Sequence, residues 1–456
     1  MRSVHQHEVF SPSRSLRRLL AACAVITLAG CGNTYRPVIS AVNPVGPAGQ
    51  PTKFAVAIAT TGATTPGLVN TIDVSGDTIV GTANLGANPF YLVLENSGGT
   101  AYTLNGDGTV NSFSNFTNLL ASNITQTTLN PNAGPVSILP QANNLYIAEQ
   151  TQNSVAQLTG TPPALKQILP TGPGTIYTVG YAGAPRVYAI SQGATTASPG
   201  TVAAIETTTN TISGTITVGR GPVYGVMTAD ARRAFILNQV DGTVTVINAQ
   251  TNQPDTFTVN GASTSTINVG TGPLWADFAP TRSEMFVVNS GSATAGGTAT
   301  GSVTVINIPL CSATSLSSNP NCDVNNPVDA AGFGGVLKTI PVGVNPIMIA
   351  VLQDGTLAYV ANAGSAAAGI AGSVSVIDLN TNTVIATIPG SLSTAADQTI
   401  HGHPNFIAAT TGTPSGKVYI TALDSTDLTI LRTDTNVVST HLSLQGSGVA
   451  VRVTNP

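Results

Sequence analysis

Two histidines separated by one glycine, His401 and His403, are the residues of this chain best placed by type and spacing to do chemistry. Alternate residues of an extended segment point the same way, so the two imidazoles could reach one ligand or one metal ion. A metal would need one or two further ligands, and Asp277 and Asp397 are the candidates we consider. The alternative is a solvated loop with two polar rings, and the sequence leaves the metal question open.

A second candidate site comes from large side chains that stand two positions after a recurring proline. They could form a stacking surface for a sugar or another planar ligand, or they could pack between neighbouring structural units. Trp275 is the only tryptophan of the chain and Asp277 follows two positions on, so this pair is the best single candidate for a ligand contact. The large side chains are Tyr91, Tyr224, Trp275, Met348 and Phe406.

Common catalytic signatures are missing from the sequence. We find no Gly-x-Ser-x-Gly elbow, no phosphate-binding glycine-rich loop, no His-Glu-x-x-His and no Cys-x-x-Cys. No stretch follows the twelve-residue calcium-loop pattern. We therefore assign no catalytic residue, expect no cofactor and favour binding over catalysis.

The elements that must position these residues are short strands in a degenerate repeat. Residues 357–390 read as strand, polar turn, strand, Thr-Asn turn and strand, after which a Gly-x-x-Pro or Asn-Pro element typically opens the next copy. Proline suits the first residue of a strand, where no ladder N–H is needed. Four strands in a unit of about fifty residues predict a β-propeller. The openers are Asn88-Pro89, Gly134-Pro135, Gly172-Pro173, Gly221-Pro222, Gly272-Pro273, Asn345-Pro346 and His403-Pro404.

Seven openers suggest seven blades, but the two ends of the sequence favour eight. Residues 54–85 hold a second, third and fourth strand without a first, and Val449 to Thr454 form a first strand without partners. Joining them would close the ring and remove exposed strand edges. We predict an all-β fold, a single propeller of four-stranded blades over residues 53–456, with eight blades favoured and seven as the alternative. The extra length at 309–335 is predicted to be a surface insertion.

The best repeat resembles a known family. Its letters YVAN, SVSVID, TNT and ATIP, at 359–362, 373–378, 381–383 and 386–389, are similar to the YVTN family of β-propeller repeats. The resemblance is strongest over 346–390 and covers most of the chain after residue 52. It implies an exported or surface-located propeller with lactonase-like relatives, and it implies a fold rather than an activity.

The first thirty residues have the features of an export signal. Arg14, Arg17 and Arg18 precede an apolar run, which ends in Leu-Ala-Gly-Cys at 28–31. This ending resembles the lipobox of bacterial lipoproteins, which implies removal of the signal peptide 1–30 and a lipid on the thiol of Cys31. The alternative is an ordinary signal peptide that contains cysteine. Residues 31–52 would then be the lipidated cysteine and a Pro/Gly-rich tether.

Glycine at position 32, in place of aspartate, favours the outer membrane or the cell surface over the inner membrane. Cys311 and Cys322 would be the remaining cysteine pair, and in an oxidising compartment they predict a disulfide. Closing so short a loop stabilises a fold by about 3 kcal/mol in the chain-entropy model. A metal site is the less favoured reading of this pair, because no histidine is near it.

Charge narrows the range of partners. Residues 1–30 hold four arginines and Glu8, so the chain without them has 12 basic and 19 acidic residues, a net charge of −7. The basic residues are scattered, which argues against nucleic-acid binding.

From these features we expect a monomeric, lipid-anchored extracytoplasmic propeller that acts as a binding or protein-interaction scaffold at the cell envelope. An envelope protein or a glycan would be its ligand. The alternative is a lactonase-like periplasmic hydrolase that uses the channel mouth, and a weaker third reading is a partner in periplasmic redox chemistry.

Overall fold

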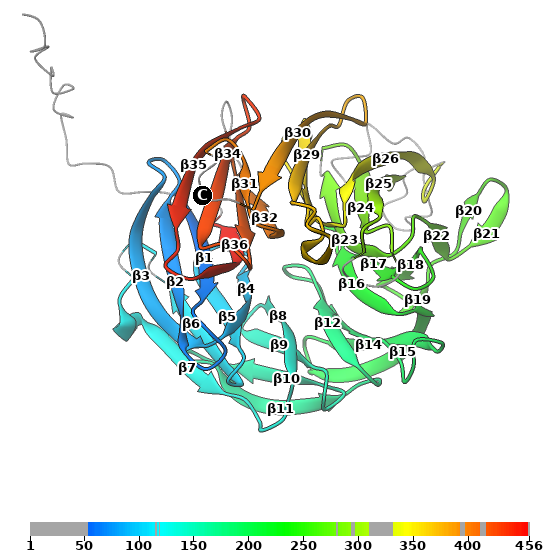
Figure 1. Cartoon of the computed structure of the whole chain (residues 1–456). Coiled ribbons are helices and arrows are strands. Elements are labelled where there is room, and N and C mark those ends of the chain that lie inside the picture. Colours follow the sequence, from blue (N-terminus) through cyan, green and yellow to red (C-terminus); the bar gives the residue numbers. More distant parts are fainter. Residues whose placement is uncertain are drawn as a thin grey trace, which may run out of the picture. The chain divides into compact units, whose positions relative to one another are not determined.

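The protein is seen here as a computed structural model that describes residues 53–454, apart from 115, 118, 280, 293–296, 310–331, 393–396 and 411–415. Within these residues the strands form a ring of eight sheets, each with four main antiparallel strands (Figure 1). The eight-bladed propeller is therefore confirmed and the seven-bladed alternative is wrong. No helix of the described part is long and apolar enough to span a membrane.

We name the blades A to H in ring order and give the strands of each from the channel outward. Blade A contains β36 (Ser447–Val453), β1 (Phe54–Thr60), β2 (Pro66–Asp73) and β3 (Thr78–Ala87), and blade B contains β4 (Pro89–Leu94), β5 (Thr100–Asn105), β6 (Thr109–Ser114) and β7 (Ile124–Thr128). Blade C contains β8 (Pro135–Gln141), β9 (Asn144–Glu149), β10 (Ser154–Thr159) and β11 (Ala164–Pro170). Blade D contains β12 (Thr175–Val179), β13 (Arg186–Ser191), β14 (Pro199–Glu206) and β15 (Thr211–Arg220).

Blades E to H complete the ring. Blade E contains β16 (Pro222–Met227), β17 (Arg233–Asn238), β18 (Thr243–Asn248) and β19 (Gln253–Pro254) with β22 (Thr266–Asn268), and blade F contains β23 (Pro273–Ala279), β24 (Glu284–Asn289), β25 (Thr300–Asn307) and β26 (Val336–Val344). Blade G contains β27 (Pro346–Val351), β28 (Leu357–Asn362), β29 (Ser373–Asp378), β30 (Thr383–Ser391) and β31 (Ile400–His401). Blade H contains β32 (Pro404–Ala409), β33 (Lys417–Ala422), β34 (Asp427–Arg432) and β35 (Val437–Ser443).

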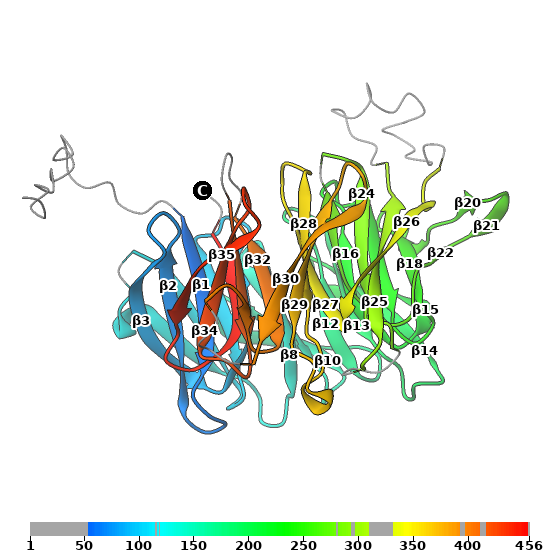
Figure 2. The same ribbon diagram turned by 45° about the horizontal axis from the view of Figure 1, so that its top comes forward.

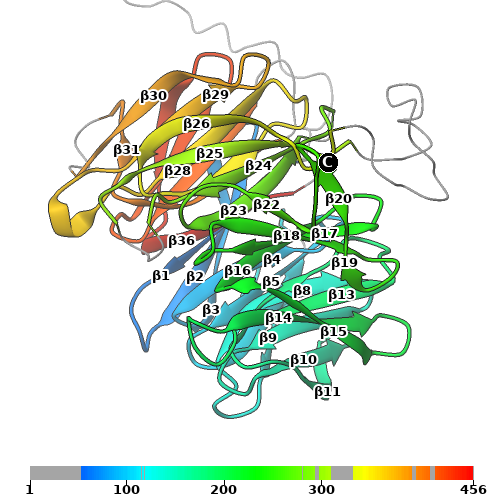
Figure 3. The ribbon, with the colours of Figure 1, turned by 90° about the vertical axis from the view of Figure 1, so that its right-hand side faces the viewer.

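Burial along the strands follows from their place in the blade. The second strand lies between two neighbouring sheets, so every residue of β17 and β24 is buried. The outermost strand has one face in solvent, and in most of β15 exposed residues accordingly alternate with half-buried or buried ones. Figure 3 shows neighbouring sheets facing each other around the ring. The core is thus a series of layers between blades, filled by Val, Ile, Ala, Phe and Tyr.

The ring is closed by the two ends of the described chain. β36 pairs antiparallel with β1, and Figure 1 shows the last strand beside the first strands of the sequence. The amide of Thr454 donates to the carbonyl of Phe54 at 2.8 Å, and the amide of Phe54 donates to the Thr454 hydroxyl at 2.9 Å. The predicted closure by the C-terminal strand is confirmed.

One opener lies two residues from its predicted place. In blade D the sequence placed it at Gly172-Pro173, whereas the left-handed residue is Gly174 (φ 68°) and β12 begins at Thr175. In five other blades the residue before the opening proline has this conformation, as at Gly221 (φ 59°). The prediction is wrong because β12 begins with Thr175 instead of a proline, whereas the turn before it contains a proline that has the sequence pattern of an opener.

Blade E carries an excursion that the sequence did not reveal. The hairpin of β20 (Phe257–Val259) and β21 (Ala262–Thr264) separates β19 from β22 and projects from the ring (Figure 2). Phe333, near the end of the predicted insertion, is 2% exposed and packs against Phe257 with ring centres 5.2 Å apart. Cys311 and Cys322 lie outside the described residues, as do Cys31 and the rest of the chain before residue 53.

Candidate functional site

The eight innermost strands share one irregularity, which fixes the order of side chains along the channel. In each of them the register against the second strand skips one residue immediately after the opener position. Positions two and four residues after the opener are therefore equivalent in all blades. In β36 the opener position is Gly448 by this alignment.

The second position carries a large side chain in six of the eight blades, counting described residues only. Ring centres lie 4.7 Å apart for Tyr177 and Tyr224, 4.1 Å apart for Tyr224 and Trp275, and 6.3 Å apart for Trp275 and Phe406. Tyr224 and Trp275 are stacked at 24°. The first two contacts join neighbouring blades, as in the packing alternative, and the third joins blades F and H, which are not neighbours in the ring. Sequence analysis missed Tyr177 because the opener of blade D was misplaced.

The fourth position is apolar in six blades and charged in two. The charged residues are Asp277 on β23 and Arg452 on β36. Equivalent positions in the other blades hold Val93, Leu139, Val179, Val226, Ala350 and Ala408. The channel thus has an apolar lining that only one carboxylate and one guanidinium interrupt at this level.

A cavity of about 290 Å³ lies at these two charges. Its wall includes Tyr224, Trp275, Met348, Asp277 and Arg452, with apolar residues of blades F, G and H around them. The structure therefore brings the predicted pair Trp275 and Asp277 to one cavity. It adds Arg452, which sequence reasoning missed, and only the alignment of the split blade A could have revealed it.

The carboxylate of Asp277 is held by the backbone. Its Oδ2 accepts a hydrogen bond from the amide of Val351 at 3.0 Å, and its Oδ1 accepts one from the amide of Phe278 at 2.9 Å. Loss of hydration in the narrow cavity raises the pKa of Asp277 to about 6, although these hydrogen bonds and the positive charge of Arg452 act in the opposite direction. Asp277 can therefore bind a donor or a cation, and it can also accept a proton near neutral pH.

Arg452 faces the aromatic side of the same channel. Its guanidinium carbon lies 4.5 Å from the ring centre of Phe406, and its Nε donates to the carbonyl of Leu92 at 3.3 Å. Burial raises the pKa of the phenols of Tyr177 and Tyr224, so these groups are neutral at physiological pH. The cavity combines one anion, one cation and neutral aromatic groups.

His401 lies between blades G and H. Its Nδ1 is 2.9 Å from Oδ2 of Asp427, its ring stacks on His441 with centres 3.7 Å apart, and it is 3% exposed. The Nε2 of His441 is in turn 2.9 Å from the carbonyl of Thr399. The imidazole of His401 is therefore a packed and paired group.

His403 turns to a different carboxylate. Its Nδ1 lies 2.5 Å from Oδ2 of Asp424, its Nε2 lies 3.2 Å from the carbonyl of Ile370, and its amide donates to Oδ1 of Asp424 at 2.7 Å. Burial would raise the pKa of Asp424, but the hydrogen bonds from His403 lower it. The structure thus gives the two histidines separate carboxylate partners, and neither histidine lines the cavity at Asp277.

A shared metal centre at these histidines finds no support in the described residues. No group of three or more His, Cys, Asp or Glu side chains among them could hold a metal ion. Asp277 lies in the channel cavity, and Asp397 is an exposed residue shortly before β31.

Neither a protein-family model nor a curated protein matches the chain. Many solved structures do, among them "Dihydro-heme d1 dehydrogenase NirN in complex with DHE", with a TM-score of 0.59 and 12% identity over 90% of this chain and 76% of that one. Apo AztD from Citrobacter koseri gives a TM-score of 0.53 and 12% identity over 88% of this chain and 97% of that one. At such identities the likeness concerns the fold alone, and the chain is an eight-bladed β-propeller.

Proposed function

We propose that this protein is an exported propeller, anchored to the membrane through a lipid on Cys31, that works by binding at the cell envelope. Support for the location comes from the lipobox-like ending at residues 28–31 and from the likeness of residues 346–390 to YVTN repeats. Support for binding comes from the channel.

The pair of charges in the channel cavity carries the proposal. Six blades fill the equivalent position with Val, Leu or Ala, so the fold itself does not need a charge there. Removing Asp277 and Arg452 from water costs free energy that apolar residues would not cost. Residues that depart from the repeat and lower stability are typical of functional sites.

The cavity indicates the kind of ligand. Its volume of about 290 Å³ is just below the roughly 300–1,000 Å³ usual for ligand pockets, which favours a small ligand. A small molecule fits that has a donor or cationic group for Asp277, an acceptor or anionic group for Arg452, and an apolar body against Trp275 and Met348.

Trp275 supplies the test of this site, because it is the only tryptophan and lines the cavity. Small-molecule fractions of cell envelope are titrated into the protein while tryptophan emission is recorded. We expect a saturable change that weakens at least tenfold in Asp277→Asn. If no fraction alters the emission, or if the variant responds like the wild type, the channel is not the binding site.

The anchor is tested by labelling cells with a radioactive fatty acid. The wild type should take up label and stay with the membrane, and Cys31→Ser should do neither. Cys23→Ser is the matched control, because Cys23 belongs to the signal peptide, and it should label like the wild type. A labelled Cys31→Ser chain would rule out lipidation at this residue.

Hydrolysis is the second candidate function, and one observation favours it. A carboxylate with a pKa of about 6 beside a cavity, as at Asp277, is suited to act as a general base. Lactone hydrolysis that is lost in Asp277→Asn and kept in His401→Ala and His403→Ala would support a hydrolase. Loss in the two histidine variants alone would place the chemistry between blades G and H instead.

A further inference from the structure

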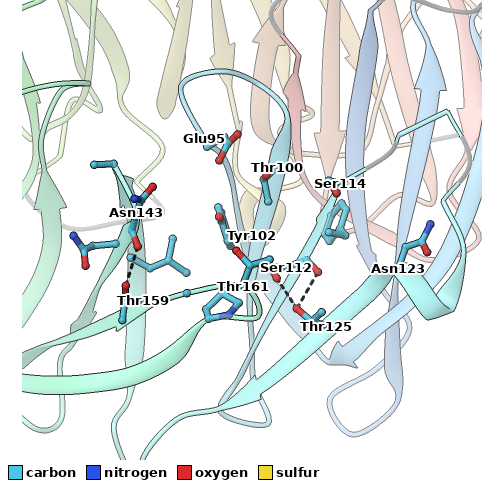
Figure 4. Close-up of a pocket in the computed structure, with 16 residues that line it drawn as sticks. Glu95, Thr100, Tyr102, Ser112, Ser114, Asn123, Thr125, Asn143, Thr159 and Thr161 are labelled. Atoms are coloured by element: carbon cyan, nitrogen blue, oxygen red, sulfur yellow. Dashed lines mark hydrogen bonds between the residues drawn. The ribbon is translucent and has the colours of Figure 1, made fainter.

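A second cavity, of about 560 Å³, opens between blades B and C (Figure 4). It lies where the first strand of each blade turns into the second and the third turns toward the fourth. Glu95, Tyr102 and Ser114 approach it from blade B, and Asn143 and Thr161 approach it from blade C. None of its lining residues belongs to the channel site.

Hydrogen bonds between residues of the protein fix the shape of this groove. The hydroxyls of Ser112 and Thr125 lie 2.5 Å apart on the blade B side, and the Thr159 hydroxyl donates to the carbonyl of Asn143 at 3.2 Å on the blade C side. The Thr127 hydroxyl donates to the carbonyl of Pro163 at 2.6 Å and joins the two blades. A ligand would therefore meet a preformed site, which lowers the entropic cost of binding.

Several polar groups of the groove remain available to a ligand. Among the described residues, the side-chain amide of Asn143 and the hydroxyls of Ser114 and Thr161 have no hydrogen-bond partner. The hydroxyl of Ser97 donates to one carboxylate oxygen of Glu95, which is half-buried and lines the groove. Tyr102 is half-buried and lies between the two sides of the groove (Figure 4).

The charge of the lining restricts the class of ligand. Among the described residues, Glu95 is the one charged residue that lines the groove, and no lysine or arginine lines it. Phosphates, nucleic acids and acidic glycans would therefore find no cationic partner. Neutral hydroxyls and amides around one aromatic ring match the alternating hydroxyl groups and C–H faces of a neutral sugar.

An extended peptide fits the groove less well. Peptides that bind propeller-like sheets by strand addition need a strand with a free edge. Of the strands that contribute to the lining, β5, β6, β9 and β10 are paired on both sides, and β7 has one unpaired edge. The lining therefore offers mainly side chains, and few unpaired backbone groups, to a ligand.

We propose that the groove between blades B and C binds a neutral oligosaccharide, with Tyr102 packed against a sugar ring and with Glu95 and Asn143 hydrogen-bonded to its hydroxyls. The inference rests on this groove alone and does not depend on the channel ligand. It assigns the protein a carbohydrate-binding face that is separate from the channel.

The test uses the purified protein on an array of neutral oligosaccharides built from hexoses and N-acetylhexosamines, with sialylated and uronate-containing glycans as acidic comparisons. The tightest neutral glycan is then titrated by calorimetry. We expect Asn143→Ala and Tyr102→Ala to weaken its binding at least tenfold and Tyr102→Phe to keep most of it. Asp277→Asn is the matched control and should bind the glycan like the wild type.

Asn143 is exposed and lies in a turn, so Asn143→Ala tests the groove even if Tyr102→Ala fails to fold. Thermal unfolding of every variant checks this point. Binding of no neutral glycan, a preference for the acidic glycans, or unchanged affinity in Asn143→Ala and Tyr102→Ala would each overturn the proposal. Binding only to a peptide array would do so as well.

Discussion

At the residue scale, a tyrosine of one blade reaches an asparagine of the next. The phenol oxygens lie 2.5, 2.9 and 2.6 Å from the acceptor Oδ1 atoms, and all three acceptors have a left-handed backbone in the turn before the outermost strand. This explains why the Thr-Asn turn recurs along the chain, since asparagine tolerates that conformation. The pairs are Tyr146 with Asn210, Tyr188 with Asn252, and Tyr359 with Asn436.

Blade F lacks the donor for this contact. Phe286 takes the tyrosine position of β24, and the Oδ1 of Asn382 in blade G is buried without a hydrogen-bond partner in the described residues. Phe286→Tyr should donate to this atom and stabilise the protein by about 1 kcal/mol, which the urea midpoint measures. Tyr359→Phe is the converse control and should destabilise by about 1–3 kcal/mol, because it leaves Asn436 unpaired. A lower midpoint for Phe286→Tyr would contradict the expected contact.

The raised pKa of Asp277 predicts a pH-dependent stability. The folded protein holds the proton up to a pH of about 6, whereas an ordinary Asp loses it near 3.8, so the folded state binds more protons between these values. Stability contributed by this group therefore falls as the pH rises from about 4 to 6. Asp277→Asn should be more stable than the wild type at pH 7, by up to about 3 kcal/mol, and equal to it at pH 4. A gap that persists at pH 4 would show that ionisation is not its cause.

At the scale of elements, glycines at the start of third strands let the opening prolines of the next blade approach. A Cβ added to Gly200 would lie 2.4 Å from Cγ of Pro222, and one added to Gly301 would lie 2.3 Å from Cγ of Pro346. The spacing between neighbouring blades therefore depends on close contacts between a glycine of one blade and the rigid proline ring of the next.

Gly200→Ala should push β14 away from β16 and cost about 1–3 kcal/mol, as overpacking does. Gly214→Ala is the matched control in β15, since a Cβ there meets no atom within 4 Å. It should be neutral or slightly stabilising, because it restricts only the unfolded chain. Thermal unfolding of both variants gives the comparison, and equal melting temperatures would refute the contact.

At the scale of the whole molecule, the ring depends on a strand from the far end of the sequence. β36 covers the edge of β1, whose first six residues are buried, and Lys417 of blade H pairs with Asp77 of blade A at 2.7 Å. Without β36 the ring would have an open, apolar strand edge.

Deletion of residues 446–456 should therefore make the protein aggregate, which size-exclusion chromatography detects. A synthetic peptide of residues 446–456 supplied during refolding should restore the soluble form, and a scrambled peptide should not. A truncated protein that stays soluble and melts like the full chain would show that the ring does not need this strand.

The sequence by itself predicted most of the strands, their grouping in fours and the closure by the last strand, and it favoured eight blades over seven. These follow from alternation of side chains and from Gly, Pro and Asn at turns, which are local signals repeated often enough to average out errors. It also singled out Trp275, because it is the only tryptophan, and Asp277, because it is an acidic residue two positions further on.

Only the tertiary structure decided what surrounds those residues. Arg452 lines the cavity at Asp277 because ring closure places the last strand at the channel. Tyr177 packs against Tyr224, although no proline before it marks its position in the repeat. His401 and His403 have neighbouring places in the sequence but separate carboxylate partners, and the groove between blades B and C exists only once the two sheets pack together. Such contacts join residues far apart in the chain, and their geometry depends on which blades become neighbours, so no local pattern encodes them.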